Sequence, residues 1–310
     1  MVQSKAHDVL IFGAGPAGMT AAMWCAQLGM NALLIDQKDK PGGQLLTIYN
    51  PIDNYPGVFT ANGKELCDHF VRSIEQCSFE TRLNTRVIKV DPASKHILLE
   101  RGESMIGTAL IIATGVRRRK LGVEGEDKFA GRGVLESGAG EKEKVRGKRV
   151  VIVGGGDAAL ENAVILSESA HEVTLVHRRD SFSARYEFTN ALRVRNNVRF
   201  ELRTIVEQII GNEVVEGVVL KNPDTDPYVL ETDHVLIRIG VEPNSDLFKG
   251  QLEMDDQGYV VVDVCCRTPI PGVFAAGDVA NPTSPTIATA VGMGVAAAKA
   301  AYAFLASDLT

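Results

Sequence analysis

Three glycines near the start of the chain have the spacing of a dinucleotide-binding turn. Gly13, Gly15 and Gly18 form a G-x-G-x-x-G pattern. In such a pattern the first glycine permits a tight turn, the second admits a pyrophosphate, and the third lets a helix pack closely on a strand. Asp36 follows at the position where a carboxylate accepts hydrogen bonds from a ribose diol. These residues predict a site for a dinucleotide with a plain ribose.

A second glycine turn, residues 154–159, reads Gly-Gly-Gly-Asp-Ala-Ala, with alanine at the last position. Where the first unit has its acid, this one has His177, followed by Arg178 and Arg179. A carboxylate would repel a ribose 2′-phosphate, whereas guanidinium groups hold it with paired hydrogen bonds. The two arginines are either a solvated charge pair or a phosphate clamp, and their placement favours a clamp for NADP(H).

Each glycine turn lies between apolar strands and a helical pattern. Expected strands are 9–12 and 32–35 around the first turn, and 150–153 and 173–176 around the second. This alternation is typical of an α/β fold with parallel sheets. We therefore expect two Rossmann-like, three-layer ββα nucleotide-binding domains.

The remaining patterns predict shorter elements. We expect a helix over 62–79, an antiparallel ribbon from 86–90 and 96–99, and strands at 109–112, 235–239, 258–264 and 273–276, with short alternating strands over 198–233. Ser284 is the expected N-cap of the last helix, with Pro285 in its first turn.

The composition excludes several classes of protein. The 310 residues carry a net charge of -6, so no basic excess is available to bind nucleic acid. We expect no membrane span, since we find no apolar run of the roughly 18 to 20 residues that crossing a bilayer needs, and we expect no signal peptide. Five cysteines without a regular framework fit a reducing compartment, so we expect a cytoplasmic protein in which Cys25, Cys67 and Cys77 are buried thiols.

Together these patterns resemble the low-molecular-weight thioredoxin reductase family of flavoproteins, over essentially the whole chain. The matching blocks are 13–18, 42–45, 113–115, 154–157, 177–180 and 271–278. The resemblance implies an FAD-binding domain from residues 1–114 and 241–310, with a second, NADP-type domain at 115–240. It also implies a homodimer, hydride transfer between nicotinamide and flavin, and a small redox protein or low-molecular-weight thiol as electron partner.

The resemblance also implies the cofactor-binding residues; no metal ligand is expected. For FAD they are Gly13, Gly15, Pro16, Ala17, Gly18, Asp36, Gln37, Gly43, Gln44, Leu45, Asn54, Val87, Ala113, Thr114, Gly115, Gly277, Asp278, Thr286 and Ile287. For the second nucleotide they are Gly154, Gly156, Asp157, Ala158, Ala159, His177, Arg178 and Arg179.

Three positions depart from the family pattern. Residues 137–140, where thioredoxin reductases carry a redox Cys-x-x-Cys, read Ser-Gly-Ala-Gly. Ser183 replaces an arginine of the phosphate clamp, although Arg185 is nearby, and Pro285-Thr286 replaces the Arg-Gln pair that opens the last helix. We therefore do not expect an ordinary thioredoxin reductase.

Two relatives without the Cys-x-x-Cys remain as alternatives. One is the NAD(P)H-dependent ferredoxin or flavodoxin reductase of the thioredoxin-reductase type, which usually extends beyond the last helix. The other is the diflavin-linked disulfide oxidoreductase group, in which a second FAD occupies the NADPH pocket. The weakened phosphate clamp and the short segment up to Thr310 favour the second group. A non-enzymatic, redox-sensing flavoprotein is a third hypothesis.

The adjacent pair Cys265-Cys266 is the candidate redox centre in this chain. Neighbouring cysteines can form a strained, easily reduced disulfide. The alternative is that side chains alternate along a strand, so that one thiol points into the core and the other outward. The sequence slightly favours that alternative.

Overall fold

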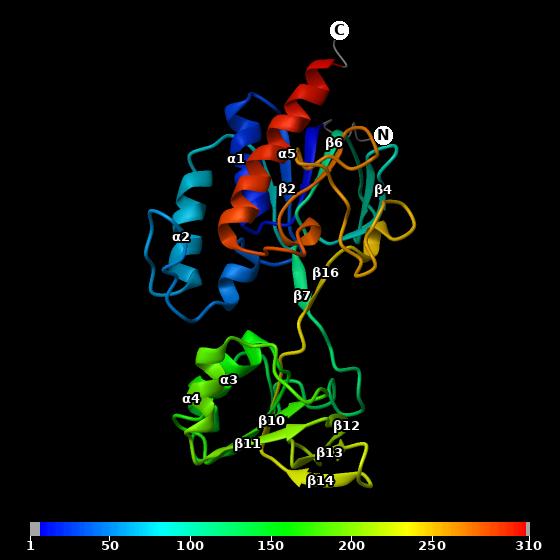
Figure 1. Cartoon of the computed structure of the whole chain (residues 1–310). Coiled ribbons are helices and arrows are strands. Elements are labelled where there is room, and N and C mark those ends of the chain that lie inside the picture. Colours follow the sequence, from blue (N-terminus) through cyan, green and yellow to red (C-terminus); the bar gives the residue numbers. More distant parts are fainter. Residues whose placement is uncertain (1–6, 308–310) are drawn as a thin grey trace. The chain divides into compact units, whose positions relative to one another are not determined.

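The computed structural model describes residues 7–307, which form two compact units. Unit 1 comprises Met1–Arg117 and Glu242–Thr310, so the blue and red ends of the chain in Figure 1 belong together. Unit 2 comprises Arg118–Val241. The boundaries fall within β7 (Val116–Arg118) and β16 (Val241–Pro243), which form a two-stranded sheet. The first boundary lies slightly later in the chain than the sequence predicts.

The sheet of unit 1 joins strands from both ends of the chain. Its order is β3-β2-β1-β6-β5-β4, with β17 also paired to β6. The strands are β1 His7–Phe12, β2 Ala32–Ile35, β3 Glu80–Arg82, β4 Val87–Asp91, β5 His96–Leu99, β6 Ser104–Ile112 and β17 Val273–Ala275. Strand β1 is parallel to both β2 and β6, so the carboxyl ends of these strands lie at one edge. The first glycine turn begins at that edge.

The two faces of this sheet bury different residues of the same strand. Val9 and Ile11 contact the core shared with α1 (Pro16–Gln27) and α5 (Ile287–Ser307), whereas Leu10 and Phe12 face the other core. This is the alternation expected of a strand buried on both sides. Figure 1 shows α1 and α5 side by side, and Gly294 of α5 has no room for a Cβ beside the backbone carbonyl of Ala17. The small residues of α5 therefore let it pack closely on α1.

By length and composition α5 could cross a membrane, so the expectation that no segment is long and apolar enough is wrong. Core helices of soluble proteins pass the same test. One face of α5, including Ala290, Ala297 and Ala301, is buried in the core of unit 1. This face supports the reading of α5 as a core helix.

Unit 2 contains a five-stranded sheet with the order β11-β10-β9-β15-β8. Its strands are β8 Val134–Leu135, β9 Arg149–Val153, β10 Glu172–His177, β11 Val198–Leu202 and β15 His234–Ile237, and its helices are α3 Asp157–Leu166 and α4 Tyr186–Arg193. A second sheet consists of the antiparallel strands β12 Ile205–Ile210, β13 Gly217–Lys221 and β14 Tyr228–Glu231. The predicted α/β class with two Rossmann-like domains is confirmed.

Three local predictions need correction. The helix predicted over 62–79 is α2 (Gly63–Ile74), which ends in a turn where the N–H of Cys77 donates to Ile74. The strand predicted over 258–264 is reduced to an isolated antiparallel bridge between Val260 and Met254, and it is followed by a turn in which Asp263 accepts the N–H groups of Cys265 and Arg267. Ser284 is not the N-cap of α5. Thr286 takes that position, and its hydroxyl accepts the N–H of Thr289 at 3.2 Å.

Candidate nucleotide-binding sites

The first glycine turn has no space for side chains. Gly13 has a φ of +100°, and a Cβ there would collide with the carbonyl oxygen of Ala113 at the end of β6. A Cβ on Gly18 would collide with the carbonyl of Gly13. The start of α1, with Pro16 at its first position, is thus held against the ends of β1 and β6. This leaves the free N–H groups of the helix to face an anionic ligand.

Backbone N–H groups of the first glycine turn and of the segment after β2 position the Asp36 carboxylate. One oxygen of its carboxylate accepts the N–H of Ala14 at 2.6 Å, and the other accepts the N–H of Lys38 at 2.8 Å. Two donors leave further lone pairs on a carboxylate. Asp36 can therefore also accept hydrogen bonds from a ribose, and Gln37 beside it is exposed.

The segment after β2 returns to the glycine turn. The N–H of Gly42 donates to Ala14 at 2.7 Å, and a Cβ on Gly43 would lie 3.0 Å from the Cα of Gly15. The short helix η1 (Gly43–Thr47) then buries Leu45, which shares a small core with Ile287 at the start of α5. The structure thereby brings together three predicted segments: 13–18, 43–45 and 286–287.

A residue missed by the sequence analysis, Asn244, fixes the predicted segment 113–115. Its side-chain amide donates to the carbonyl of Thr114 at 2.8 Å, and its own carbonyl accepts the Thr114 hydroxyl at 2.8 Å. The side-chain amide of Gln44 donates to Val116 at 2.5 Å. These bonds span large sequence separations, so no local pattern indicates them.

Asp278 lies three residues beyond the end of β17, at the same edge of the sheet. Gly277 before it has a φ of +77°, and a Cβ there would lie 2.9 Å from the Cβ of Ala17 in α1. Burial raises the pKa of the Asp278 carboxyl above its usual value. Within residues 7–307 this side chain makes no hydrogen bond or ion pair. A half-buried acid without a partner fits a ligand hydroxyl.

Two other predicted FAD residues are less clearly placed at this edge. Asn54 is exposed in the loop after η1, and Val87 begins β4 and packs against the opposite core of the sheet. The first glycine turn, Asp36 and Asp278 fit an FAD molecule. The turn suits its pyrophosphate, Asp36 suits its ribose, and Asp278 suits the hydroxyl groups of its ribityl chain.

In unit 2, Arg238 and His177 occupy the space beside the glycines of the second turn. A Cβ on Gly154 would collide with the carbonyl of Arg238, and one on Gly155 would collide with the ring of His177. The His177 ring stacks on Phe182 with centroids 5.5 Å apart, and its Nε2 is buried without a hydrogen-bond partner among residues 7–307. Burial, followed by the charges of Arg179 and Arg178, lowers the pKa of His177, which favours a neutral imidazole at pH 7.

The predicted phosphate clamp is exposed and unpaired. In the described part of the chain, the side chains of Arg178 and Arg179 form no ion pair. Arg185 is not available to complete the clamp, because its Nε lies 2.9 Å from the carboxylate of Asp157 and its N–H donates to the same group at 2.7 Å. Ser183 donates to the carbonyl of Gly155 instead. Two free cations beside a glycine turn fit the 2′-phosphate of NADP(H) or another phosphate.

The loop at residues 137–140 is held by a carboxylate. Glu141 accepts the N–H groups of Glu136 and Ser137 at 2.7 and 2.9 Å. Gly138 lies against Asn162 of α3, where the side-chain amide oxygen leaves no room for a Cβ. The backbone is therefore ordered by polar contacts, and no thiol is present in the loop.

The adjacent cysteines differ in exposure, and both are free. Cys266 is buried with a φ of +63°, and its thiol donates to the carbonyl of Met293 at 3.5 Å. Burial, then the charges of Asp263 and Cys265, raises the pKa of Cys266 to about 11. Cys265 is half-buried against the same core. The expected alternation along a strand is wrong, because these residues lie in a turn.

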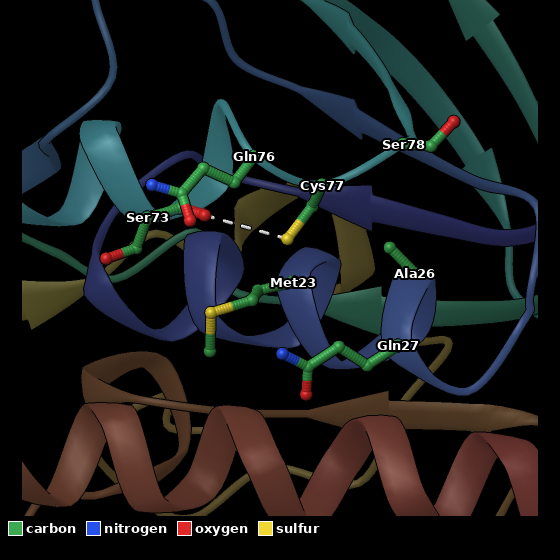
Figure 2. A pocket seen from close by; sticks show the side chains of 7 residues that line it. All are labelled: Met23, Ala26, Gln27, Ser73, Gln76, Cys77 and Ser78. Atoms are coloured by element: carbon green, nitrogen blue, oxygen red, sulfur yellow. Dashed lines mark hydrogen bonds between the residues drawn. The ribbon is translucent and has the colours of Figure 1, made fainter.

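The other three thiols are mostly buried. Burial raises the pKa of Cys25, to about 12, and that of Cys67. Cys77 was expected to be buried but is half-exposed, in a hollow of about 420 Å³ between α1 and the end of α2. Figure 2 shows its thiol directed at the backbone of Ser73, whose carbonyl lies 3.6 Å away. Its exposure follows from the early end of α2.

Comparisons with known proteins agree with this geometry. Residues 7–294 match the family described as pyridine nucleotide-disulphide oxidoreductase. The chain is 34% identical over 294 residues to a thioredoxin reductase of Listeria monocytogenes, covering 94% of this chain and 92% of that one. It is 31% identical over 307 residues to a 34.2 kDa protein in the rubredoxin operon of Clostridium pasteurianum, covering 98% and 99%.

Among solved structures, thioredoxin reductase from Lactococcus lactis (FR conformation) matches with a TM-score of 0.86 and 32% identity, covering 97% of this chain and 99% of that one. The match extends over both units. This match and the two glycine turns at the edges of parallel sheets point to the same family. The chain belongs to the pyridine nucleotide-disulphide oxidoreductase family and is a thioredoxin-reductase-like oxidoreductase.

Proposed function

We propose that unit 1 binds FAD and unit 2 binds a second nucleotide, either a second FAD or NADP(H), and that the protein passes electrons between these cofactors and a dithiol or disulfide. The observation that carries the proposal is the contrast between the two glycine turns. The first is accompanied by the acids Asp36 and Asp278, and the second by the unpaired cations Arg178 and Arg179. The first suits hydroxyl groups and the second suits phosphate.

In this proposal, bound FAD supplies the electron-transfer chemistry and the protein supplies position. The N–H groups at the start of α1 hold the pyrophosphate, Asp36 orients the ribose, and Asp278 accepts from the ribityl hydroxyls. The start of α5, capped by Thr286, would offer the positive end of its dipole to the negative charge of a reduced flavin.

We further propose that this chain is not an ordinary thioredoxin reductase and is closest to the diflavin-linked disulfide oxidoreductases. The loop at residues 137–140, which is Ser-Gly-Ala-Gly and is held by Glu141, supports the first statement. The weakened phosphate clamp supports the second, because Ser183 replaces an arginine and Arg185 is paired with Asp157. A redox step in unit 2 would therefore have no thiol at residues 137–140. A dithiol would have to come from the partner or from Cys265 and Cys266.

The first experiment is the amount of FAD released per purified chain. Two FAD molecules would identify the second nucleotide as flavin. One FAD, followed by anaerobic bleaching with NADPH, would identify it as NADPH. A chain that releases no flavin after native purification, and takes up none when FAD is added, would contradict the proposal.

The alternative is an NAD(P)H-dependent reductase of ferredoxin or flavodoxin. Two observations favour keeping it: the pKa of Cys266 is raised to about 11, which makes its thiolate scarce, and one relative is named for a rubredoxin operon. Alkylating the partly exposed thiols, Cys265 and Cys77, is expected to abolish dithiol exchange through Cys265 and to leave ferredoxin reduction unchanged. The C265S variant provides the matched control, because it should show no further loss on alkylation.

The clamp gives a prediction of its own. If the second nucleotide is NADP(H), R178Q and R179Q are each expected to weaken NADPH binding about tenfold, since each loses a charge-assisted hydrogen bond to the 2′-phosphate. NADH binding should change little. Equilibrium titration measures both, and R199Q serves as a control because Arg199 is exposed and paired with Glu172. Equal losses for NADPH and NADH would count against a 2′-phosphate clamp.

We also propose that the protein is a cytoplasmic homodimer, on the strength of the family resemblance. Sedimentation equilibrium should then find a species of twice the chain mass. A monomer at micromolar concentration would contradict the dimer.

A further inference from the structure

Arg238 lies at the point of unit 2 where a dinucleotide would cross the sheet. The chain leaves β9 through α3 toward β10 on one side, while β15 and β8 lie on the other side of β9. In such sheets the ligand crevice opens at the carboxyl ends of the strands where the order reverses, here between β9 and β15. Arg238 directly follows β15, and its N–H donates to Val153 of β9 at 2.7 Å.

The backbone of Arg238 also touches the glycine turn. Its carbonyl oxygen is the atom that excludes a Cβ at Gly154. Its guanidinium donates to the carbonyl of Ile237 at 2.8 Å and to that of Glu136, which leads into the loop at residues 137–140, at 2.9 Å. The side chain thus lies between the end of β15 and that loop, beside the second nucleotide site.

This guanidinium is a buried charge without a carboxylate partner. The residue is 5% exposed, its Nε has no hydrogen-bond partner, and it forms no ion pair within residues 7–307. The neighbouring charges are Arg118, which adds to the positive potential, and Glu141, which partly offsets it. Burial and Arg118 lower its pKa to about 10, so the group is still charged at neutral pH. A buried, incompletely paired cation is costly, which calls for a role.

We infer that Arg238 makes the second nucleotide site select a neutral ring over a cationic one. The inference rests on the proposed function and specifies its ligand. The oxidised nicotinamide of NADP+ is positively charged, whereas the rings of FAD and of NADPH are neutral.

Arg178 and Arg179 follow β10 on one side of the glycine turn, and Arg238 follows β15 on the other, so a ligand whose 2′-phosphate is held by the two arginines would extend its ring toward Arg238. Like charges that come close in surroundings of low polarity repel strongly. NADP+ and NADPH share their phosphates and riboses, so only the nicotinamide ring distinguishes these two ligands.

The test compares two ligands that differ in ring charge. NADP+ and the tetrahydro analogue of NADPH, whose ring is neutral and donates no hydride, are titrated by calorimetry into protein freed of loosely held nucleotide by dialysis at high salt. The wild-type protein is expected to bind the analogue at least tenfold more tightly. R238M should reduce that preference about tenfold, because it removes the repulsion between the guanidinium and the cationic ring. R238K keeps the charge and should keep most of the preference.

A purely structural role for Arg238 predicts something different. Loss of the ties to Ile237 and Glu136 would weaken both ligands equally and leave their ratio unchanged, which would overturn the inference. R199M is the control, since Arg199 lies on β11 and is exposed. The thermal midpoint of each variant verifies that it is folded. Failure of the wild-type protein to bind either ligand would overturn the role of Arg238 and an NADP(H) site, whereas the proposed second site itself would fall only if the flavin count also gave a single FAD per chain.

Discussion

G13A is expected to yield a protein that carries almost no FAD. Gly13 has a φ of +100°, which an alanine adopts only at a cost of about 1 kcal/mol or more. In addition, the new Cβ would collide with the backbone carbonyl of Ala113. The collision cannot be relieved by a side-chain rotation, because both groups belong to the ends of adjacent strands, β1 and β6. The turn must move, and the pyrophosphate N–H groups move with it. Flavin absorbance per purified chain measures the loss.

G29A separates the two effects. Gly29 also has a positive φ, +76°, but no atom lies within 4 Å of its missing Cβ. This variant should lose about 1 kcal/mol of unfolding free energy and keep its flavin. If G13A kept a full complement of FAD, or if G29A lost flavin equally, the close approach of Gly13 to Ala113 would not be what the site requires.

The sequence predicts those parts of the fold that depend on short local patterns, such as apolar runs and glycine motifs. Four consecutive apolar residues between turns are typical of buried parallel strands, so these strands were predictable. The strand Ala32–Ile35 has the predicted bounds, and β1 and β9 each begin one or two residues before the predicted start. Both glycine turns have the predicted strand before them and helix after them. Here local and tertiary preferences agree.

The predictions that were wrong lie where polar side chains compete with the backbone. Residues 258–264 are an almost continuous apolar, valine-rich run of the kind found in strands, but Asp263 accepts hydrogen bonds from the backbone two and four residues later and makes a turn. At α5 both Ser284 and Thr286 have a hydroxyl suited to an N-cap. Thr286 is the residue used, and it exchanges hydrogen bonds with Thr289 three residues on.

The sequence predicts the motifs of the candidate sites, but not the residues from other parts of the chain that hold these motifs in place. Asn244 and Arg238 both lie beside candidate nucleotide sites, yet each makes contacts with residues about a hundred or more positions away in the sequence. Spacing rules describe neighbours along the chain, so they find the glycine turns and Arg178. They cannot find a residue that the sheet topology brings to the same edge.

D278N is expected to have opposite effects on the flavin-free and flavin-bound protein. Burial raises the folded-state pKa of Asp278 above its usual value of 3.8. The folded state therefore holds this proton more tightly than the unfolded state, and stability falls as the pH rises through the unfolded pKa toward the folded pKa. Asparagine has nothing to ionise. Flavin-free D278N should thus have a higher thermal midpoint than the flavin-free wild type at neutral pH, and the difference should vanish below about pH 4.

With FAD the sign reverses, because an amide oxygen is a weaker acceptor than a carboxylate. FAD binding by D278N is expected to weaken by roughly ten- to a hundredfold, the range for a hydrogen bond to a charged group. Flavin fluorescence on titration measures the affinity, and differential scanning calorimetry measures the midpoints. D256N is the control, since Asp256 is exposed in the same unit. A flavin-free variant less stable than the wild type at neutral pH would show that Asp278 supports the fold. An unchanged FAD affinity would remove Asp278 from the site.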